Sequence, residues 1–331
     1  MIRSLYFQPN RPLQLDLEPG EAIRALRNRR GLLWLDFVGE PPETCEPILK
    51  SFGFHPLAID DALQETHSPK IDDWGDYVYL VINYMRLNGH EQDHWDTEVD
   101  ELDIFLGPNY VVTHHDHPVP AIDTVIANCQ RDPRYLREGA DHLLYKIIDY
   151  VVAGYMPIVE RVDEAIDEIE DQVFDRPSPR TLERIFALKR VLLAMRRILL
   201  PQREVLNKLA RDDYAVVDRK DRIFFRDIYD HLVRLHDLNE TMRDLVGGAL
   251  DTYLSVVNNR MNEVMKTLTI ITTLFMPLSF IAAVFGMNFF LPNAGDAVWE
   301  LMTRPAFFAV VVILVVTPVL MYTWMRRRTW V

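Results

Sequence analysis

Small polar side chains recur at helical spacing along an apolar segment near the end of this chain. Around the segment Leu268 to Phe285, which has no charged residue, one helical face carries Asn262, Met265, Thr269, Thr272, Met276, Ser279 and Ala283. Hydroxyls, amides and carbonyls suit a cation that keeps its water shell, and Mg²⁺ dehydrates more reluctantly than other biological divalent ions. The face therefore favours a path for hydrated cations, although Ser and Thr within a membrane equally serve to hold helices together.

Larger apolar side chains on the same segment offer a way to close such a path. Rings of Met265, Leu268 and Met276, contributed by several copies of the chain, would narrow it and stop flow by dewetting. The face has no carboxylate, Lys or Arg. It offers neither a tight direct ligand for a cation nor a charged ring that attracts anions.

Two apolar segments near the C-terminus approach the length that crosses a bilayer, which is roughly 20 residues for a helix. They run from Leu268 to Phe285 and from Ala306 to Trp324. The loop between them, which begins at Gly286 and reaches Pro305, is too short to form a domain. We expect two transmembrane helices joined by a tight hairpin.

Basic residues flank the two spans more often than they occur in the loop. They are Arg260 and Lys266 before the first span, Arg304 in the loop, and Arg326, Arg327 and Arg328 after the second. This asymmetry places the bulk of the chain and both termini in the cytoplasm. No cleavable signal is evident at the N-terminus. We therefore expect an integral protein of the plasma (inner) membrane.

The charge balance is strongly acidic, with 36 basic and 49 acidic residues and a formal net charge of -13. Nucleic acid is therefore excluded as a partner, and divalent cations are favoured. The same acidity also keeps a large cytosolic region soluble. The two cysteines, Cys45 and Cys129, are too few for a disulfide framework or a thiolate zinc site.

Residues 1–135 alternate between short strand and helix patterns, which predicts a cytoplasmic α/β domain. The expected strands are Leu32 to Phe37, Tyr77 to Leu87, Glu101 to Leu106 and Tyr110 to His114. The expected helices are Glu43 to Phe52 and Pro56 to Leu63. Gly and Pro punctuation between these runs separates the elements.

Residues 136–223 predict an antiparallel pair of helices. The first carries an apolar stripe from Leu143 to Ile169 opposite an acidic face, and Pro177-Ser178-Pro179 ends it. The second begins at Ser178 or Thr181 and runs past Pro201. Its basic residues complement the acidic face of the first helix, which favours pairing.

The pattern from about Phe224 to Asn288 shows no helix stop except Gly247-Gly248 and Pro277, which a long packed helix tolerates. At about 1.5 Å per residue this helix would be roughly 100 Å long. Its exposed apolar positions need other helices, and near the membrane only copies of itself are at hand. We therefore expect a homo-oligomer. The expected divisions are 1–135, 136–223, 224–288 for the stalk and first span, 289–304 for the external loop, 305–325 for the second span and 326–331 for a basic tail.

The chain resembles the CorA magnesium transporters over nearly its whole length. The family's Tyr-Gly-Met-Asn signature stands here as Phe285-Gly286-Met287-Asn288, at the outer end of the first span. Upstream, Asn262-Glu263-Val264-Met265-Lys266, Leu268-Thr269-Ile270-Ile271 and Phe275-Met276-Pro277-Leu278 resemble the family's pore helix. The resemblance implies an α+β membrane protein that forms a funnel-shaped homopentamer with long stalk helices.

The resemblance also implies roles for individual residues. Asn288 would form a ring that holds a hydrated Mg²⁺ at the outer mouth, with Gly286 allowing close approach and Met287 completing the signature. The pore positions would be Asn262, Met265, Leu268 and Met276. Cytoplasmic Mg²⁺ would bind between neighbouring subunits, at carboxylates that we assign to Asp60, Asp61, Asp149 and Asp227. Loss of that ion would leave carboxylates that repel one another and let the subunits move apart.

The implied function is a passive channel that admits Mg²⁺, with Co²⁺ or Ni²⁺ as further ions, and that cytoplasmic Mg²⁺ closes. Entry of a doubly charged ion gains about 4.6 kcal/mol per 100 mV, so no ATP machinery is needed. The related ZntB zinc transporters are an alternative, although Met287 favours the magnesium group. The loop Phe289-Phe290-Leu291-Pro292-Asn293 lacks the acidic residues common in the family. A weakly selective ion channel with the same architecture is therefore a further alternative.

A membrane-anchored enzyme or signalling domain is the alternative from a different class. The sequence shows no convincing nucleophile with a base, no HExxH motif and no cofactor fingerprint, so we expect no enzyme. The run His114-His115-Asp116-His117 ends a predicted strand and supplies imidazoles that suit Zn²⁺, Ni²⁺ or Co²⁺. Because side chains alternate along a strand, at most two of the four could share an ion. We expect these to be simple surface histidines.

Overall fold

The computed structural model describes residues 1–26, 31–64, 67–88, 95–286 and 304–328. The chain divides into two compact units, Met1–Thr252 and Tyr253–Val331. The first unit contains a seven-stranded sheet in the order β2-β1-β3-β7-β6-β5-β4. Its strands are β1 (Ile2–Phe7), β2 (Gln14–Leu15), β3 (Leu32–Val38), β4 (Lys70–Asp73), β5 (Val78–Asn88), β6 (Asp96–Gly107) and β7 (Tyr110–His115).

The centre of the sheet is the parallel pair β3 and β7, in which Leu35 lies opposite Val112. The other described strand pairs are antiparallel. Strand β3 reads LLWLDFV and is buried on both faces, as expected for a parallel strand that helices cover from both sides. A charged residue inside this run, Asp36, is 0% exposed and needs partners.

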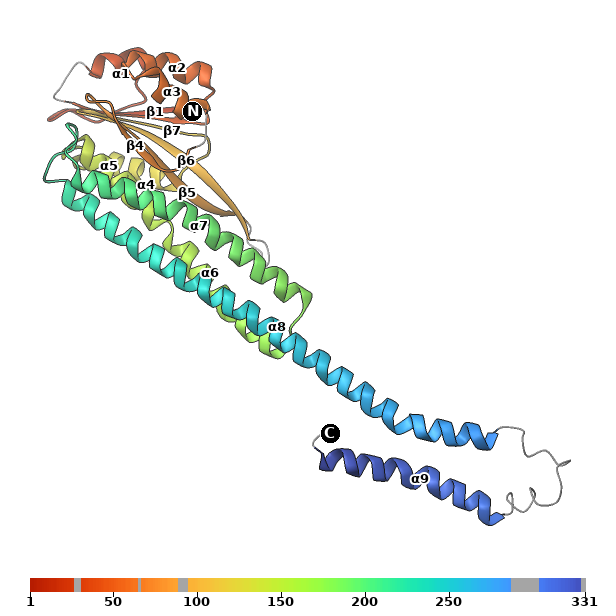
Figure 1. The fold of residues 1–331 in the computed structure, drawn as a ribbon. Helices are drawn as coiled ribbons and strands as arrows, with labels where there is room; N and C mark the ends of the chain where they lie inside the picture. The colour runs from red at the N-terminus through yellow and green to blue at the C-terminus, as the bar shows by residue number, and fades with distance from the viewer. Residues whose placement is uncertain (27–30, 65–66, 89–94, 287–303, 329–331) are drawn as a thin grey trace. The chain divides into compact units, whose positions relative to one another are not determined.

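Helices cover both faces of the sheet, which makes the first unit a layered α/β domain (Figure 1). One face carries α1 (Pro19–Leu26), α2 (Pro42–Ser51) and α3 (Pro56–Gln64). The core beneath them includes Leu35, Phe37, Leu49, Phe54 and Phe105. The opposite face carries α4 (Pro120–Arg131), α5 (Ala140–Ala153) and part of α7 (Pro179–Arg211). The short 3-10 helix η1 (Pro133–Leu136) lies between α4 and α5 in the chain.

The predicted first long helix is divided in two, so the expectation of one continuous helix up to Pro177 was wrong. Helix α5 ends at Ala153, and α6 (Met156–Asp175) begins after Gly154 and Tyr155. Pro157 lies in the first turn of α6, where its ring and missing N–H would break a continuous helix. The buried Tyr155 hydroxyl stabilises the break by donating to the backbone oxygen of Asn83 at 2.5 Å.

Helix α7 begins where the sequence predicts a helix start. Ser178 precedes it as the N-cap, and its hydroxyl accepts a hydrogen bond from the Thr181 amide at 3.2 Å. The helix continues past Pro201 to Arg211 and lies beside α6 (Figure 1). Arg184 on α7 donates to Glu168 on α6 at 2.6 Å, one contact between the basic and acidic faces.

Helix α8 (Arg222–Gly286) is continuous over 65 residues and includes both Gly247-Gly248 and Pro277. In the first unit its buried residues Phe225, Ile228 and Leu232 follow helical spacing and pack into the core. In the second unit the rest of α8 is followed by α9 (Arg304–Arg327). Among the described residues, α8 and α9 are long and apolar enough to cross a membrane, with mean hydropathies of 1.9 and 2.2 in their most apolar stretches.

Candidate functional site

The predicted path-lining residues lie on one stretch of α8 and all have exposed side chains. They are Asn262, Met265, Leu268, Thr269, Thr272, Met276 and Ser279. The exposed fractions of Met265, Leu268 and Met276 are 56%, 57% and 71%. Within one chain the face is therefore free to meet a lipid, another helix or an ion path.

Two hydroxyls on this face donate their protons within the helix. Thr269 Oγ1 donates to the Met265 backbone oxygen at 2.7 Å, and Thr272 Oγ1 donates to the Leu268 backbone oxygen at 2.9 Å. A hydroxyl has one proton and two lone pairs, so an engaged proton leaves the oxygen as an acceptor. Waters around a cation point their hydrogens outward, and these hydroxyl oxygens can accept hydrogen bonds from them.

The predicted outer mouth is only partly described. Gly286 is the last residue of α8. Met287 and Asn288 lie outside the described residues, as does the external loop as far as residue 303. Their roles therefore stay predictions.

Two of the predicted regulatory aspartates come together within one chain. Asp149 lies on α5 and is half-buried, and Asp227 lies on α8 and is exposed. Burial raises the pKa of Asp149, the nearby Lys146 and His231 oppose that shift, and the Asp227 charge adds to it. The pair is an electronegative position between two helices of the same subunit.

The other two predicted regulatory aspartates lie elsewhere. Asp60 and Asp61 are on α3, which covers the face of the sheet opposite α5 (Figure 1). Asp60 is exposed, and Asp61 forms an ion pair with Lys70. One chain therefore keeps Asp60 and Asp61 apart from Asp149 and Asp227.

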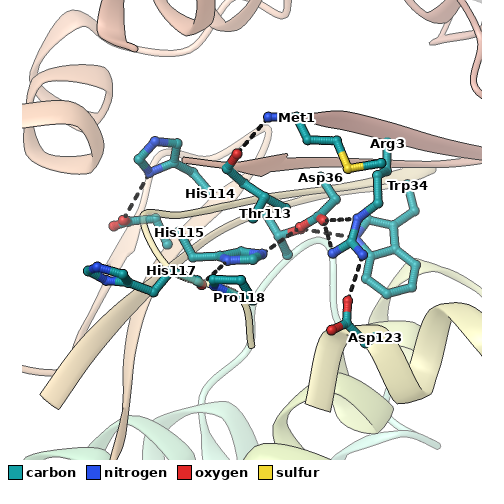
Figure 2. A network of polar contacts seen from close by, with 12 residues as sticks. Met1, Arg3, Trp34, Asp36, Thr113, His114, His115, His117, Pro118 and Asp123 are labelled. Atoms are coloured by element: carbon teal, nitrogen blue, oxygen red, sulfur yellow. Dashed lines mark hydrogen bonds and ion pairs between the residues drawn. The ribbon is translucent and has the colours of Figure 1, made fainter. Parts of the chain in front are cut away.

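The expectation of surface histidines was wrong for two of the three. His114 and His115 are 5% and 1% exposed, whereas the His117 side chain is 57% exposed. The reason is that β7 lies in the middle of the sheet, so its last residues are covered on both faces. Figure 2 shows the His114 and His115 side chains on different sides of the strand, as alternation requires.

His115 belongs to a buried network centred on Asp36 (Figure 2). Its Nδ1 lies 2.6 Å from the His117 backbone oxygen and its Nε2 lies 3.1 Å from Asp36 Oδ1. The Thr113 hydroxyl donates to the same Asp36 oxygen at 2.5 Å. Both ring nitrogens of His115 face acceptors, so neither is free to bind a metal ion.

Arg3 completes this network and ties three strands to a helix (Figure 2). Its Nε and Nη2 donate to Asp36 Oδ2 at 2.9 and 2.6 Å, and its Nη1 donates to Asp123 Oδ1 at 2.6 Å. Burial alone would raise the pKa of Asp36, but the contacts with His115, Thr113 and Arg3 hold it below its usual range. The network joins β1, β3 and β7 to α4 and has a structural role.

His114 faces a small polar cavity of about 130 Å³ beside Glu101 and Asp103. Its Nδ1 is 3.6 Å from Asp103 Oδ2, which is too long for a hydrogen bond. The Tyr79 hydroxyl donates to Asp103 Oδ1 at 2.5 Å. Burial and the Asp103 charge raise the pKa of Glu101 to about 8. The Glu101 carboxyl in this cavity is therefore protonated near neutral pH.

Sequence reasoning missed both buried clusters. The signal for the first was a charged residue within an apolar strand, Asp36 in LLWLDFV, because a buried charge requires a partner. For the second, Glu101 and Asp103 are two residues apart on β6 and so share one face. Neither signal identifies the partner strand.

Comparison with known proteins places the chain among metal ion transporters. A cobalt/magnesium transport protein CorA of Thermotoga maritima is 33% identical over 313 residues, which cover 94% of this chain and 86% of the relative. A putative metal ion transporter of Bacillus subtilis, YfjQ, is 36% identical over 299 residues, 90% of this chain and 89% of the relative.

A solved structure has the same fold. The CorA magnesium transporter of Methanocaldococcus jannaschii superposes with a TM-score of 0.77 at 23% identity, over 99% of this chain and 98% of that one. The predicted α+β architecture is thereby confirmed. The sequence profile of the family described as "CorA-like Mg2+ transporter protein" matches residues 29–327. Because that match spans most of the chain, this protein belongs to the family of CorA-like Mg²⁺ transporter proteins.

Proposed function

We propose that this protein is a passive channel that carries Mg²⁺ across a membrane into the cell and that cytoplasmic Mg²⁺ closes. The observation that carries the proposal is the exposed face of α8. It presents hydroxyl oxygens whose protons are engaged within the helix, at Thr269 and Thr272, beside exposed methionines. Family membership supplies the class of cargo, a divalent metal ion.

The channel is formed by several copies of the chain. Two spans cannot enclose a path within one monomer, so each copy contributes its α8 face around a common axis. The family resemblance favours a funnel-shaped homopentamer. Gly286, Met287 and Asn288 would lie at the outer mouth, where five Asn288 side-chain oxygens accept hydrogen bonds from the water shell of the ion.

Acceptor oxygens without carboxylates favour a hydrated ion. Mg²⁺ keeps its waters more strongly than other biological divalent ions, so it can be recognised through them. Co²⁺ and Ni²⁺ carry a similar octahedral shell and would follow the same path. Met265, Leu268 and Met276 would form the narrow apolar part, which closes by losing its water.

The proposed gating site joins the four aspartates across neighbouring subunits. Since one chain keeps Asp60 and Asp61 on the opposite face from Asp149 and Asp227, a joint site requires two subunits. Mg²⁺ between them would hold the interface together and the pore closed. When the ion leaves, the carboxylates repel one another and the subunits separate.

The proposed location is the plasma (inner) membrane with both termini in the cytoplasm. Support comes from the two helices that are long and apolar enough to span, and from the basic residues Arg326 and Arg327 at the end of α9. Inward flow down the membrane potential needs no other energy source. The regulatory carboxylates then sample cytoplasmic Mg²⁺.

The test is ion flux into proteoliposomes that contain the purified full-length protein. Mg²⁺, Zn²⁺, Co²⁺ and K⁺ are compared at several internal Mg²⁺ concentrations, with Asn288→Ala as the variant that removes the outer amide ring. Mg²⁺ entry that internal Mg²⁺ suppresses, and that the variant lacks, supports the proposal. Equal passage of K⁺ would identify a weakly selective channel, and Zn²⁺ entry only under a proton gradient would identify a zinc transporter of the ZntB type.

A further inference from the structure

Three aspartates that the proposed function does not use meet where α5 and α8 begin. Asp141 lies in the first turn of α5, Asp218 lies in the segment between α7 and α8, and Asp221 immediately precedes α8. One carboxylate oxygen from each lies within 4.8 Å of the other two. Asp141 and Asp221 are 6% and 1% exposed, whereas Asp218 is exposed to solvent.

The backbone holds this cluster in place from two sides. The Asp218 amide donates to Asp141 Oδ2 at 2.9 Å, and the His142 amide donates to Asp141 Oδ1 at 3.0 Å. The His142 ring places Nδ1 at 3.0 Å from Asp221 Oδ1. Asp141 therefore has both oxygens engaged by amides, and each still has a lone pair that can bind a cation.

Asp221 has a buried oxygen that these contacts leave unused. Its Oδ2 accepts no hydrogen bond within the described part of the chain, and the side chain is 2% exposed. An aspartate directly before a helix ordinarily accepts a hydrogen bond from the amide two or three residues further on. Capping therefore does not account for this oxygen, and a buried carboxylate oxygen without a partner is costly.

The charges around the cluster do not balance. Besides the His142 ring on Asp221 Oδ1, the basic group paired with the cluster is Lys220, whose Nζ lies 3.7 Å from Asp221 Oδ2 and 3.8 Å from Asp218 Oδ2. Both distances exceed a hydrogen bond, and the Lys220 side chain is 57% exposed. Burial raises the pKa of Asp141, and the Asp221 and Asp218 charges raise it further against the two amide hydrogen bonds.

We propose that Asp141, Asp218 and Asp221 bind a hard divalent cation of the Mg²⁺ or Ca²⁺ class. The ligands are carboxylate oxygens, which such ions prefer, and the exposed Asp218 side leaves positions for water and a route of entry. The Lys220 ammonium occupies the approach and moves into solvent when the ion binds. This site is separate from the pair Asp149 and Asp227, and it would exist even in a chain that transported nothing.

The bound ion would stabilise the start of the longest helix of the protein. Its ligands come from the first turn of α5, from the segment before α8, and from the residue that immediately precedes α8. The same two helices carry Asp149 and Asp227 further along. A bound ion would therefore fix the N-terminal ends of the two helices that carry the proposed regulatory pair.

The experiment counts Mn²⁺ ions bound to the full-length protein in detergent, by electron paramagnetic resonance of the free ion. Mn²⁺ is the probe because it prefers oxygen ligands and is directly visible. Asp218→Asn alters an exposed side chain, and Asp221→Asn alters the buried one. Each should lose one Mn²⁺ per chain or bind it at least tenfold more weakly, while Asp212→Asn, an exposed aspartate earlier in the same segment, should bind as the wild type does.

Lys220→Met distinguishes a metal site from an ordinary ion-pair cluster. Removal of a competing ammonium should tighten Mn²⁺ binding and increase the rise in melting temperature that Mn²⁺ causes. Unchanged Mn²⁺ number and affinity in Asp218→Asn, with circular dichroism showing an intact fold, would overturn the proposal. So would a Lys220→Met variant that melts lower and binds Mn²⁺ no more tightly.

Two further readouts separate this inference from the proposed function. Asp227→Asn should leave the Mn²⁺ bound by this cluster in place, and a loss of the same ion would show that only one site exists. Proteoliposomes that fail to take up Mg²⁺ would contradict the transport proposal. They would leave the Mn²⁺ count, and hence this site, unaffected.

Discussion

Asp149 on α5 and Asp227 on α8 lie close enough within one chain for the Asp227 charge to raise the pKa of the Asp149 carboxyl, beyond the larger effect of burial. The two carboxylates therefore repel each other, and the nearby Lys146 and His231 partly offset that repulsion. A divalent ion that approaches this pair relieves the repulsion, and a second subunit can supply further ligands. This is the pair at which we propose that cytoplasmic Mg²⁺ is sensed.

Asp227→Asn should weaken closure of the channel by internal Mg²⁺. The variant removes one charge but keeps the shape and the exposed position of the side chain. Half-maximal closure should then need an internal Mg²⁺ concentration about tenfold higher, because one ligand charge is lost. A tenfold change corresponds to about 1.4 kcal/mol of binding free energy. Flux into proteoliposomes at graded internal Mg²⁺ measures this, and Asp230→Asn on the exposed surface of the same helix is the control. An unshifted closing concentration in Asp227→Asn would remove the aspartate from the sensor.

Asp36→Asn should destabilise the first unit by about 3 kcal/mol, because it leaves the Arg3 guanidinium without its buried anion. For a unit of this size the melting temperature should fall by roughly 10 °C. Asp123→Asn is the control, since the Asp123 side chain is 52% exposed and its ion pair with Arg3 should contribute less than about 1 kcal/mol. Thermal unfolding of the full-length variants in detergent measures both. An equal fall in melting temperature in the two variants would show that the burial of Asp36 does not determine the loss of stability.

The sequence predicted those parts of the fold that depend on local pattern. The apolar runs at β3 and β7, the Ser178 cap of α7 and the long α8 all follow from spacing and capping within a few residues. The short strand β1 was missed because its pairing with β3 is a long-range contact that no local pattern reveals. The break after α5 was missed because the apolar stripe continues across Gly154 and Pro157.

The candidate site divides in the same way. A helical face such as Asn262, Thr269 and Thr272 can be read from spacing alone, and the structure describes these residues together on α8. Partners across the fold cannot be read in this way. The contact of His115 with Asp36 spans 79 positions in the sequence, so histidines that were predicted to lie at the surface are buried. The cluster of Asp141 with Asp218 and Asp221 was missed for the same reason, since α5 and α8 are brought together by packing.

Stability should depend on pH through Glu101. Burial and the Asp103 charge raise the pKa of Glu101 to about 8. The native state therefore keeps a proton on Glu101 that the unfolded chain releases above about pH 4.5. The contribution of Glu101 to the free energy of unfolding is full below that pH and is lost as the pH rises towards 8. Glu101→Gln stays neutral and can still accept the hydrogen bond that the His67 amide donates at 2.6 Å.

The expected result is that Glu101→Gln melts higher than the wild type at pH 8 and that the difference shrinks towards pH 5. Glu98→Gln is the matched control, because Glu98 lies on the same strand with a 48% exposed side chain paired to Arg86. Its effect should be small at both pH values. Melting curves recorded from pH 5 to pH 8 measure this. A difference in melting temperature between Glu101→Gln and wild type that stays constant over this range would show that Glu101 is ionised throughout.

Thr272→Val should reduce Mg²⁺ flux, whereas Thr272→Ser should preserve it. Valine keeps the shape of the side chain but removes the oxygen that is left as an acceptor when the hydroxyl donates to the Leu268 backbone oxygen. The substitution removes an acceptor from every subunit, and loss of even one hydrogen bond to the hydration shell, at about 1 kcal/mol, corresponds to about a fivefold lower flux.

Thr267→Val is the matched control on the same helix. Thr267 is also exposed and makes the equivalent internal bond, to the Glu263 backbone oxygen at 2.9 Å. It lies five residues before Thr272, and hence about 140° away around the helix, so it faces away from the proposed path. If acceptor oxygens on one face guide the hydrated ion, only Thr272→Val lowers Mg²⁺ uptake into proteoliposomes. If both valine variants lower it equally, the threonines act through the helix backbone, and the path must lie on another face of α8.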